Sequence, residues 1–203
     1  MKVITMPRSR PFVAVVIAVC VAGISNWTGL AQSNETKPLD YVIALIAQGR
    51  ADGRLGTARK TRPVDARKAK PGEIIVTTIK GEGKETQSRP AVEGDWVVRN
   101  RCPATGDEEY LVAAGKFAER YRSAGSATTQ DGWQAFVPQG KPLRFLTLRA
   151  VEAPFTFTAP WNEAMIARPG DALVQDPENE RDVYRVARAS FDCTYEVVTP
   201  VAK

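Results

Sequence analysis

The chain has 203 residues, of which 43% are hydrophobic and 25% are charged, with a formal net charge of +5 at pH 7. It contains no histidine, which excludes histidine-based triads, Cys-His dyads and histidine metal ligands. The positive charge is uneven: residues 50–70 carry eight basic residues against two acidic ones, whereas residues 71–203 are mildly acidic. A domain without a basic face argues against nucleic-acid binding.

The N-terminus predicts export. Three basic residues precede an apolar run at 12–24, and Gly29 and Ala31 supply the small residues of a cleavage site. We therefore expect a signal peptide over 1–31, cleaved near Ala31, and a periplasmic or secreted protein. The alternative is an uncleaved inner-membrane anchor, although the run is shorter than the roughly 20 residues that span a bilayer.

Residues 32–49 predict a short amphipathic helix. Pro38 begins it, four apolar residues share one face (Leu39, Val42, Ile43 and Ile46), and Gly49 ends it. A helix of about 11 residues is unstable alone. Its apolar face must therefore pack on its own domain or dock to a partner or membrane.

Residues 50–70 predict a flexible basic linker, because glycines and charges dominate and large apolar residues are almost absent. The alternative is contact with an anionic surface such as lipid head groups or acidic wall polymer. The residues that would make that contact are Arg59, Lys60, Arg62, Arg67, Lys68 and Lys70.

An internal repeat organises the remainder of the chain. A Gly-Asp pair at 94–95 recurs at 170–171, and the tyrosine of the following segment recurs 74 residues later, at 110 and 184. A fixed order of this kind indicates a duplicated unit. We assign the first unit to 71–124, a connecting loop to 125–140 and the second unit to 141–203.

Each unit is predicted to contain a hairpin, a Gly-Asp turn, two strands and a short helix. The expected inward residues are Tyr110 with Val112 and Tyr184 with Val186. A ring pair four residues apart closes each unit on one helix face, Phe117 with Tyr121 and Phe191 with Tyr195. The fold class is thus a β-rich α+β domain of about 130 residues made of two packed repeat units.

Two cysteines, Cys102 and Cys193, remain after signal cleavage. In an oxidising compartment an even number favours a disulfide, which here would join one unit to the other. Two isolated thiols, or a reactive Cys102, are the alternatives.

Acidic residues offer the only enzyme-like material. Asp95 and Asp171 are related by the repeat and would form an acid/base pair if the units faced each other, but an aspartate after a glycine turn usually bonds nearby backbone amides. The alternating acids of 176–182 lack the glycine of an EF-hand loop. We expect no metal and no cofactor.

Three tryptophans are candidates for ligand contact, namely Trp96, Trp133 and Trp161. Aromatic rings in loops or at hairpin ends can grip a glycan or a peptide, whereas core packing is the alternative use of the same side chains.

The second unit carries Pro169-Gly170-Asp171 and a closing Phe191-Asp192-Cys193-Thr194-Tyr195-Glu196. It resembles small bacterial and phage proteins of unknown function with a Pro-Gly-Asp-aromatic motif and a closing Phe-x-x-Thr-Tyr-Glu. The resemblance covers about 141–198, and Ala172 stands where the motif has an aromatic residue. It implies a fold and no activity.

Together these patterns predict an exported, non-enzymatic binding or scaffolding protein of the bacterial cell envelope, with an envelope protein or glycan as partner. A small envelope hydrolase using Asp95 and Asp171, or a peripheral membrane adaptor held by the basic linker, are the alternatives.

Overall fold

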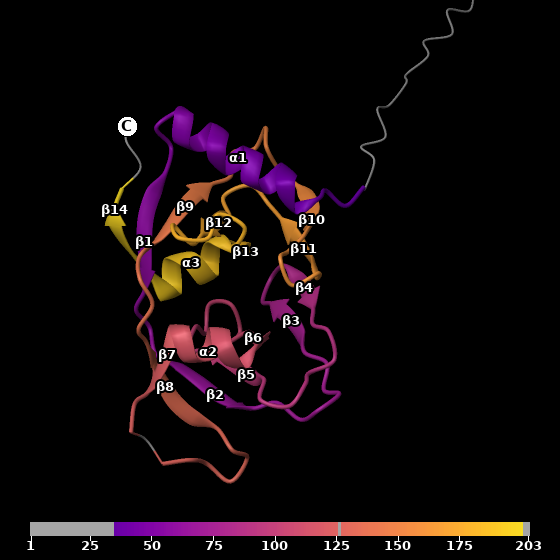
Figure 1. Cartoon of the computed structure of the whole chain (residues 1–203), viewed down its shortest axis with the longest axis vertical. Coiled ribbons are helices and arrows are strands. Elements are labelled where there is room, and N and C mark those ends of the chain that lie inside the picture. Colours follow the sequence, from indigo (N-terminus) through magenta and orange to yellow (C-terminus); the bar gives the residue numbers. More distant parts are fainter. Residues whose placement is uncertain (1–34, 126, 201–203) are drawn as a thin grey trace, which may run out of the picture. The chain divides into compact units, whose positions relative to one another are not determined.

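The computed structural model describes residues 35–125 and 127–200, which lie in one contact unit. The predicted signal peptide falls outside the described residues. Within them the structure is β-rich, with three helices and fourteen strands (Figure 1). The elements are α1 (Leu39–Ala51), β1 (Gly56–Lys60), β2 (Val64–Lys68), β3 (Val76–Ile79), β4 (Gly83–Gln87), β5 (Trp96–Asn100), β6 (Glu109–Val112), α2 (Ala114–Arg120), β7 (Tyr121–Ser123), β8 (Gln134–Pro138), β9 (Leu143–Thr147), β10 (Phe155–Thr158), β11 (Ala164–Ala167), β12 (Ala172–Gln175), β13 (Val183–Val186), α3 (Arg188–Thr194) and β14 (Tyr195–Thr199).

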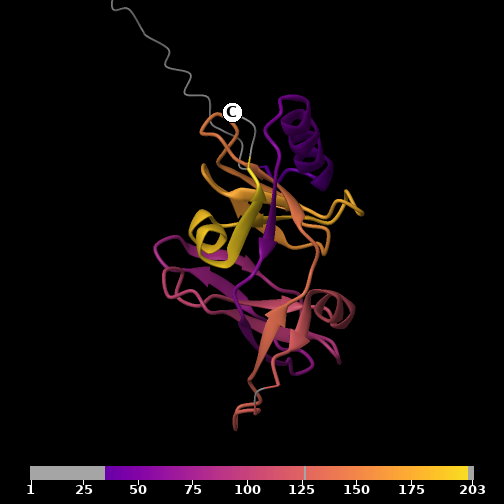
Figure 2. The same ribbon diagram turned by 90° about the vertical axis from the view of Figure 1, so that its left-hand side faces the viewer.

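Two antiparallel five-stranded sheets dominate the fold. The first has the strand order β6-β5-β2-β8-β7, and the second has the order β13-β12-β9-β1-β14. Two separate hairpins, β3-β4 and β10-β11, complete the strands. Figure 2 shows the two sheets as an upper and a lower layer with the chain passing between them.

The chain crosses between the sheets after β1 and again after β8. Strand β1 pairs with β9 and β14, which come from the C-terminal segment, while β8 pairs with β2 and β7 from the N-terminal segment. Only residues 61–63 and 139–142 connect these strands to the next ones. If the chain is divided between β7 and β8, each sheet thus contains four strands from one half and one strand, β8 or β1, from the other half.

The Gly-Asp turns precede β5 and β12. Gly94 has φ +93° and Gly170 has φ +88°, a region that glycine enters without the steric cost of a Cβ atom. Asp95 accepts a hydrogen bond from the N–H of Val92, and Asp171 accepts one from the N–H of Arg168. Turn glycine and aspartate thus set the start of both strands.

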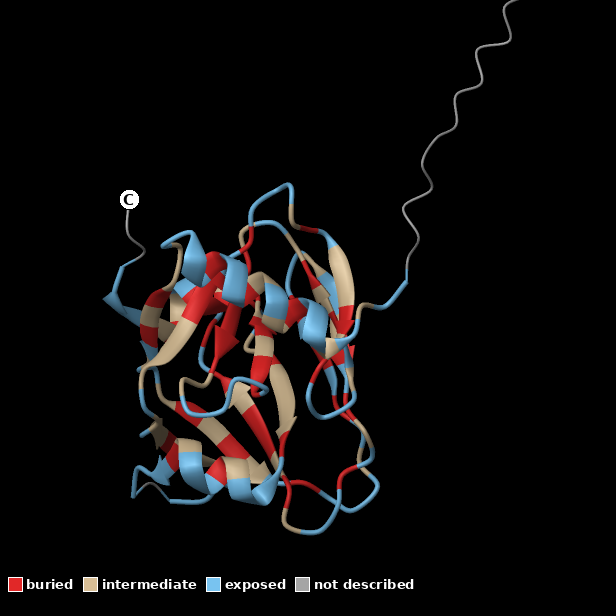
Figure 3. Ribbon diagram, turned by 45° about the horizontal axis from the view of Figure 1, so that its top comes forward, coloured by how far each residue is buried: buried red, intermediate tan, exposed pale blue. Residues whose placement is uncertain are grey.

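The predicted helix over 38–48 is present as α1, and its apolar face packs on the domain. Val42 and Ile46 are buried in a cluster with Leu146, Phe157 and Leu173. Figure 3 shows buried residues on the inner side of α1 and exposed residues on its outer side. The apolar face is therefore already covered by the chain itself.

The prediction of a flexible linker over residues 50–70 is wrong. Residues 56–60 and 64–68 are β1 and β2, which lie inside the two sheets. Gly56, taken as a sign of flexibility, packs so closely on Phe145 that an added Cβ would lie 2.4 Å from the ring. The connecting loop predicted over 125–140 likewise contains β8.

Two details of the predicted strands and helices also differ. In β13 the fully buried side chains are Val183 and Arg185, while Tyr184 is half-buried. Helices α2 and α3 end one residue before Tyr121 and Tyr195, which begin strands. The ring pairs nevertheless form, with centroids 5.2 Å apart for Phe117 and Tyr121.

Replacing Ile46 with alanine is expected to lower the free energy of unfolding by about 2 to 4 kcal/mol, because the side chain is 1% exposed and would leave a cavity. Ile74, which is 47% exposed, is the matched control, and its alanine variant should lose under about 1 kcal/mol. Urea unfolding followed by tryptophan fluorescence measures both. A loss in Ile46→Ala as small as the loss in Ile74→Ala would show that packing of α1 does not stabilise the domain.

Candidate functional site

A cavity of about 840 Å³ is lined by side chains from both five-stranded sheets and from α2 and α3. Its volume falls within the range of about 300–1,000 Å³ that is usual for small-molecule sites. Apolar residues such as Val112 and Leu143 line part of it, and polar groups line the rest. Ligand sites commonly combine apolar walls with polar groups that orient the ligand.

Four tyrosines line the cavity in two hydroxyl pairs. The hydroxyls of Tyr110 and Tyr121 are 3.0 Å apart, and those of Tyr184 and Tyr195 are 3.4 Å apart. Burial raises the pKa of Tyr110, Tyr184 and Tyr195 above its ordinary value. These hydroxyls therefore stay protonated near neutral pH and are available as donors.

Lys60, at the end of β1, joins the first tyrosine pair. Its ammonium donates to Oδ1 of Asn100 at 2.6 Å and to the hydroxyl of Tyr110 at 2.8 Å. It also lies 5.2 Å from the centroid of the Tyr110 ring and 5.9 Å from that of Tyr121. Because Lys60 belongs to the second sheet and Tyr110 to the first, this contact joins the two sheets at the wall of the cavity.

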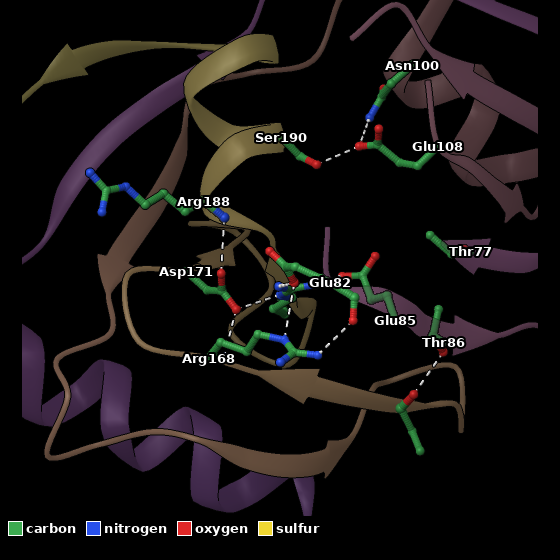
Figure 4. Close-up of polar contacts among 12 residues, drawn as sticks. Thr77, Glu82, Glu85, Thr86, Asn100, Glu108, Arg168, Asp171, Arg188 and Ser190 are labelled. Carbon is green, nitrogen blue, oxygen red and sulfur yellow. Dashed lines mark hydrogen bonds and ion pairs between the residues drawn. The ribbon is translucent and has the colours of Figure 1, made fainter. Parts of the chain in front are cut away.

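A buried glutamate extends the same network. Glu108 Oε1 accepts hydrogen bonds from Asn100 Nδ2 at 2.7 Å and from Ser190 Oγ at 2.6 Å (Figure 4). Thr105 donates to its other oxygen. Neutral donors from β5, from the loop that follows β5 and from α3 thus satisfy the carboxylate.

An ion cluster lies beside the second tyrosine pair. Arg120 is 3.1 Å and Lys116 is 3.2 Å from Oδ2 of Asp182. The Arg120 guanidinium also lies 5.1 Å from the centroid of the Tyr184 ring. Two cations from α2 therefore share one buried carboxylate, which directly precedes β13 of the opposite sheet.

A second ion cluster surrounds Arg185. Its guanidinium contacts Asp171 at 2.7 Å, Glu82 at 2.7 Å and Glu85 at 2.6 Å, and its side chain is 1% exposed. Burial raises the pKa of Glu85, and Arg185 opposes that shift. The cluster fastens the β3-β4 hairpin to β13.

The predicted pair Asp95 and Asp171 has structural contacts instead of lining the cavity. Asp95 binds Arg89 and the N–H groups of Val92 and Ala114, and Asp171 binds Arg185 and the N–H groups of Arg168 and Arg188. Figure 4 shows Asp171 with Arg168 and Arg188. Both carboxylates connect a turn to the first residue of the following helix.

The pairing predicted for Cys102 and Cys193 is confirmed by a disulfide with a Cα–Cα distance of 6.1 Å. It joins the loop after β5 to α3 and therefore links the two sheets close to Glu108 and Ser190.

The three candidate tryptophans have different surroundings. Trp96 stacks on Phe117 with centroids 4.1 Å apart, and Trp133 is covered by Arg67 and Arg99. Trp161, which is 39% exposed, lines the cavity and lies 6.0 Å from the Tyr184 ring. Trp161 is thus the one of the three that is placed to contact a cavity ligand.

The six basic residues predicted to meet an anionic surface have different surroundings. Arg67 is paired with Glu73, Arg62 bonds the carbonyl of Arg101, and Lys60 lines the cavity. The remaining three, Arg59, Lys68 and Lys70, are exposed on or beside the same two strands.

The acidic loop of 176–182 is occupied by ion pairs. Glu178 pairs with Lys141, and Glu180 pairs with Arg50. Across the described ranges, no three histidine, cysteine, aspartate or glutamate side chains gather to hold a metal ion. In the same ranges no helix has the length and apolarity needed to cross a bilayer.

Sequence reasoning took the repeated tyrosines as core rings and did not place their hydroxyls. A signal was present, since tyrosine rather than phenylalanine stands at all four repeated positions. No protein-family profile, curated protein or solved structure matches this chain. Function is therefore inferred from the cavity itself.

Proposed function

We propose that this chain is an exported, non-enzymatic binding protein of the bacterial cell envelope, and that the cavity between its sheets is the ligand site. The observation that carries the proposal is the 840 Å³ cavity into which four tyrosines and Lys60 converge. Its apolar residues can bury part of a small molecule, and its polar groups can orient that molecule.

Export is supported by the basic and apolar pattern of residues 1–31 and by the disulfide. Disulfides persist in oxidising compartments and are rare in reducing ones. Both features favour a periplasmic or secreted location.

We further propose that the two sheets derive from one duplicated unit, related to the Pro-Gly-Asp proteins that the second unit resembles. This proposal is supported by a pair of contacts between the two units that involve equivalent positions of the repeat. Glu108 binds Ser190. The residue 74 positions after Glu108 is Asp182, and the residue 74 positions before Ser190 is Lys116. These two side chains also bind each other. Reciprocal contacts are typical of twofold interfaces. The cavity would then lie at the contact between two related halves.

A cavity-blocking substitution tests the binding proposal. Gly140 lines the cavity and Gly115 does not, and an added Cβ meets nothing within 4 Å at either position. We expect a small molecule to co-purify with the wild-type protein from the periplasm and with Gly115→Trp, and to be absent from Gly140→Trp, because the indole ring takes its space.

Native mass spectrometry of the three proteins measures the bound mass, and their intact masses also show whether residues 1–31 have been removed. A ligand retained by Gly140→Trp would place its site elsewhere. No ligand in any of the three would contradict the proposal.

A further inference from the structure

Lys60 differs from the other cations of the cavity. The other cationic side chains that line it, Arg89, Lys116, Arg120, Lys141, Arg181 and Arg185, each have a carboxylate oxygen within 4.0 Å. Lys60 has none among the described residues, and its two hydrogen-bond acceptors are an amide and a phenol oxygen. Its positive charge is therefore not compensated by direct contact.

The nearest carboxylate in this network is Glu108, and Asn100 stands between it and the ammonium. Three neutral donors already bind Glu108, so it is satisfied without Lys60. A half-buried ammonium without a contacting anion is electrostatically suited to receive one.

Free donors remain around the same space. An ammonium has three N–H groups, and Lys60 uses two of them in the recorded contacts. Tyr184 and Tyr195 carry two hydroxyl protons and share one contact, so within the described residues one proton has no recorded acceptor. Arg120 adds positive potential beside this second pair.

We propose that the cavity binds a small organic anion, a carboxylate or a phosphate monoester, with its oxygens held by the ammonium of Lys60 and the tyrosine hydroxyls. The apolar part of the ligand lies against Val112 and Leu143. This inference rests on the proposed function, which it narrows to a ligand class.

The tyrosines make the test site-selective. Of the five tyrosines in the chain, four line the cavity, and Tyr41 does not. NMR signals of the four cavity tyrosines therefore report on ligand binding, and the signal of Tyr41 serves as an internal reference. The probes are benzoate and phenyl phosphate, with benzamide as the neutral match of benzoate.

We expect benzoate or phenyl phosphate to shift the four cavity signals at lower concentration than benzamide, with Tyr41 unchanged. Lys60→Met should weaken binding of the anion by about tenfold or more and leave benzamide binding unchanged. Lys60→Arg keeps the charge and should bind within a few fold of wild type, provided that both variants retain the wild-type melting temperature.

Lys84→Met is the matched control, because Lys84 is exposed, has a neutral partner and does not line the cavity. Which anion binds more tightly separates a carboxylate ligand from a phosphate ligand. Benzamide binding as tight as benzoate, or unchanged anion binding by Lys60→Met, overturns the anion inference and leaves the cavity as a ligand site. If no probe shifts a cavity tyrosine, both proposals are contradicted.

Discussion

Replacing Arg185 with methionine is expected to lower the free energy of unfolding by about 3 to 5 kcal/mol at pH 7, the cost of breaking a buried ion cluster from one side. Methionine preserves much of the side-chain volume and removes the charge. Asp171, Glu82 and Glu85, each within 2.7 Å of the guanidinium, would then face one another without a shared cation.

The loss of unfolding free energy in Arg185→Met should depend on pH, and the ionisation of Glu85 determines the direction of that dependence. Burial raises the pKa of this carboxyl above its ordinary value of 4.5, and loss of Arg185 raises it further. A group with a raised folded-state pKa stabilises the fold below its unfolded pKa and loses that contribution as pH rises through the folded value. The variant should therefore lose stability relative to wild type as pH increases from 4.5 to 7.

Urea unfolding at pH 5 and pH 7 measures both effects. Arg50→Met is the control, since its ion pair with Glu180 is about half exposed and should contribute no more than about 1 kcal/mol. A loss in Arg185→Met that is the same at both pH values would show that carboxylate repulsion is not its cause.

Removing the disulfide by replacing Cys102 and Cys193 with serine is expected to cost about 4 kcal/mol, because the bond closes a loop with a sequence separation of 91. In a protein of this size each kcal/mol shifts the melting temperature by about 2 to 4 °C. The expected decrease is thus about 8 to 16 °C by these scales.

Differential scanning calorimetry with and without a reductant provides the control. The reductant should lower the melting temperature of the wild-type protein to that of the double variant and leave the double variant unchanged. A double variant as stable as wild type would show that the sheets hold together without the covalent link.

The elements that the sequence predicted well are those with local signals. Gly94 and Gly170 mark turns by their backbone conformation, and the hairpin glycines Gly81 and Gly83 have positive φ for the same reason. Such residues determine structure within a few positions of themselves. Strands β5 and β12 directly follow such turns, and strands β6 and β13 were predicted from the alternating segment that recurs in the repeat.

The strands that were missed depend on distant partners. Gly56 and Ala58 of β1 have little strand propensity, yet both are buried because Phe145 and β14 cover them. The same holds for the site. Lys60 belonged to a basic stretch by composition, and only the long-range pairing of β1 brings its ammonium to Tyr110.

The position of β1 also governs the order in which the protein can fold during synthesis. Its partners are β9 and β14, so the strand that leaves the ribosome early must wait until residue 199 has emerged before its sheet is complete. Sheets built from such distant segments close slowly. The second sheet of a nascent chain therefore stays incomplete until nearly all of the chain has been made, whereas the strands of the first sheet lie within residues 64–138 and can pair earlier.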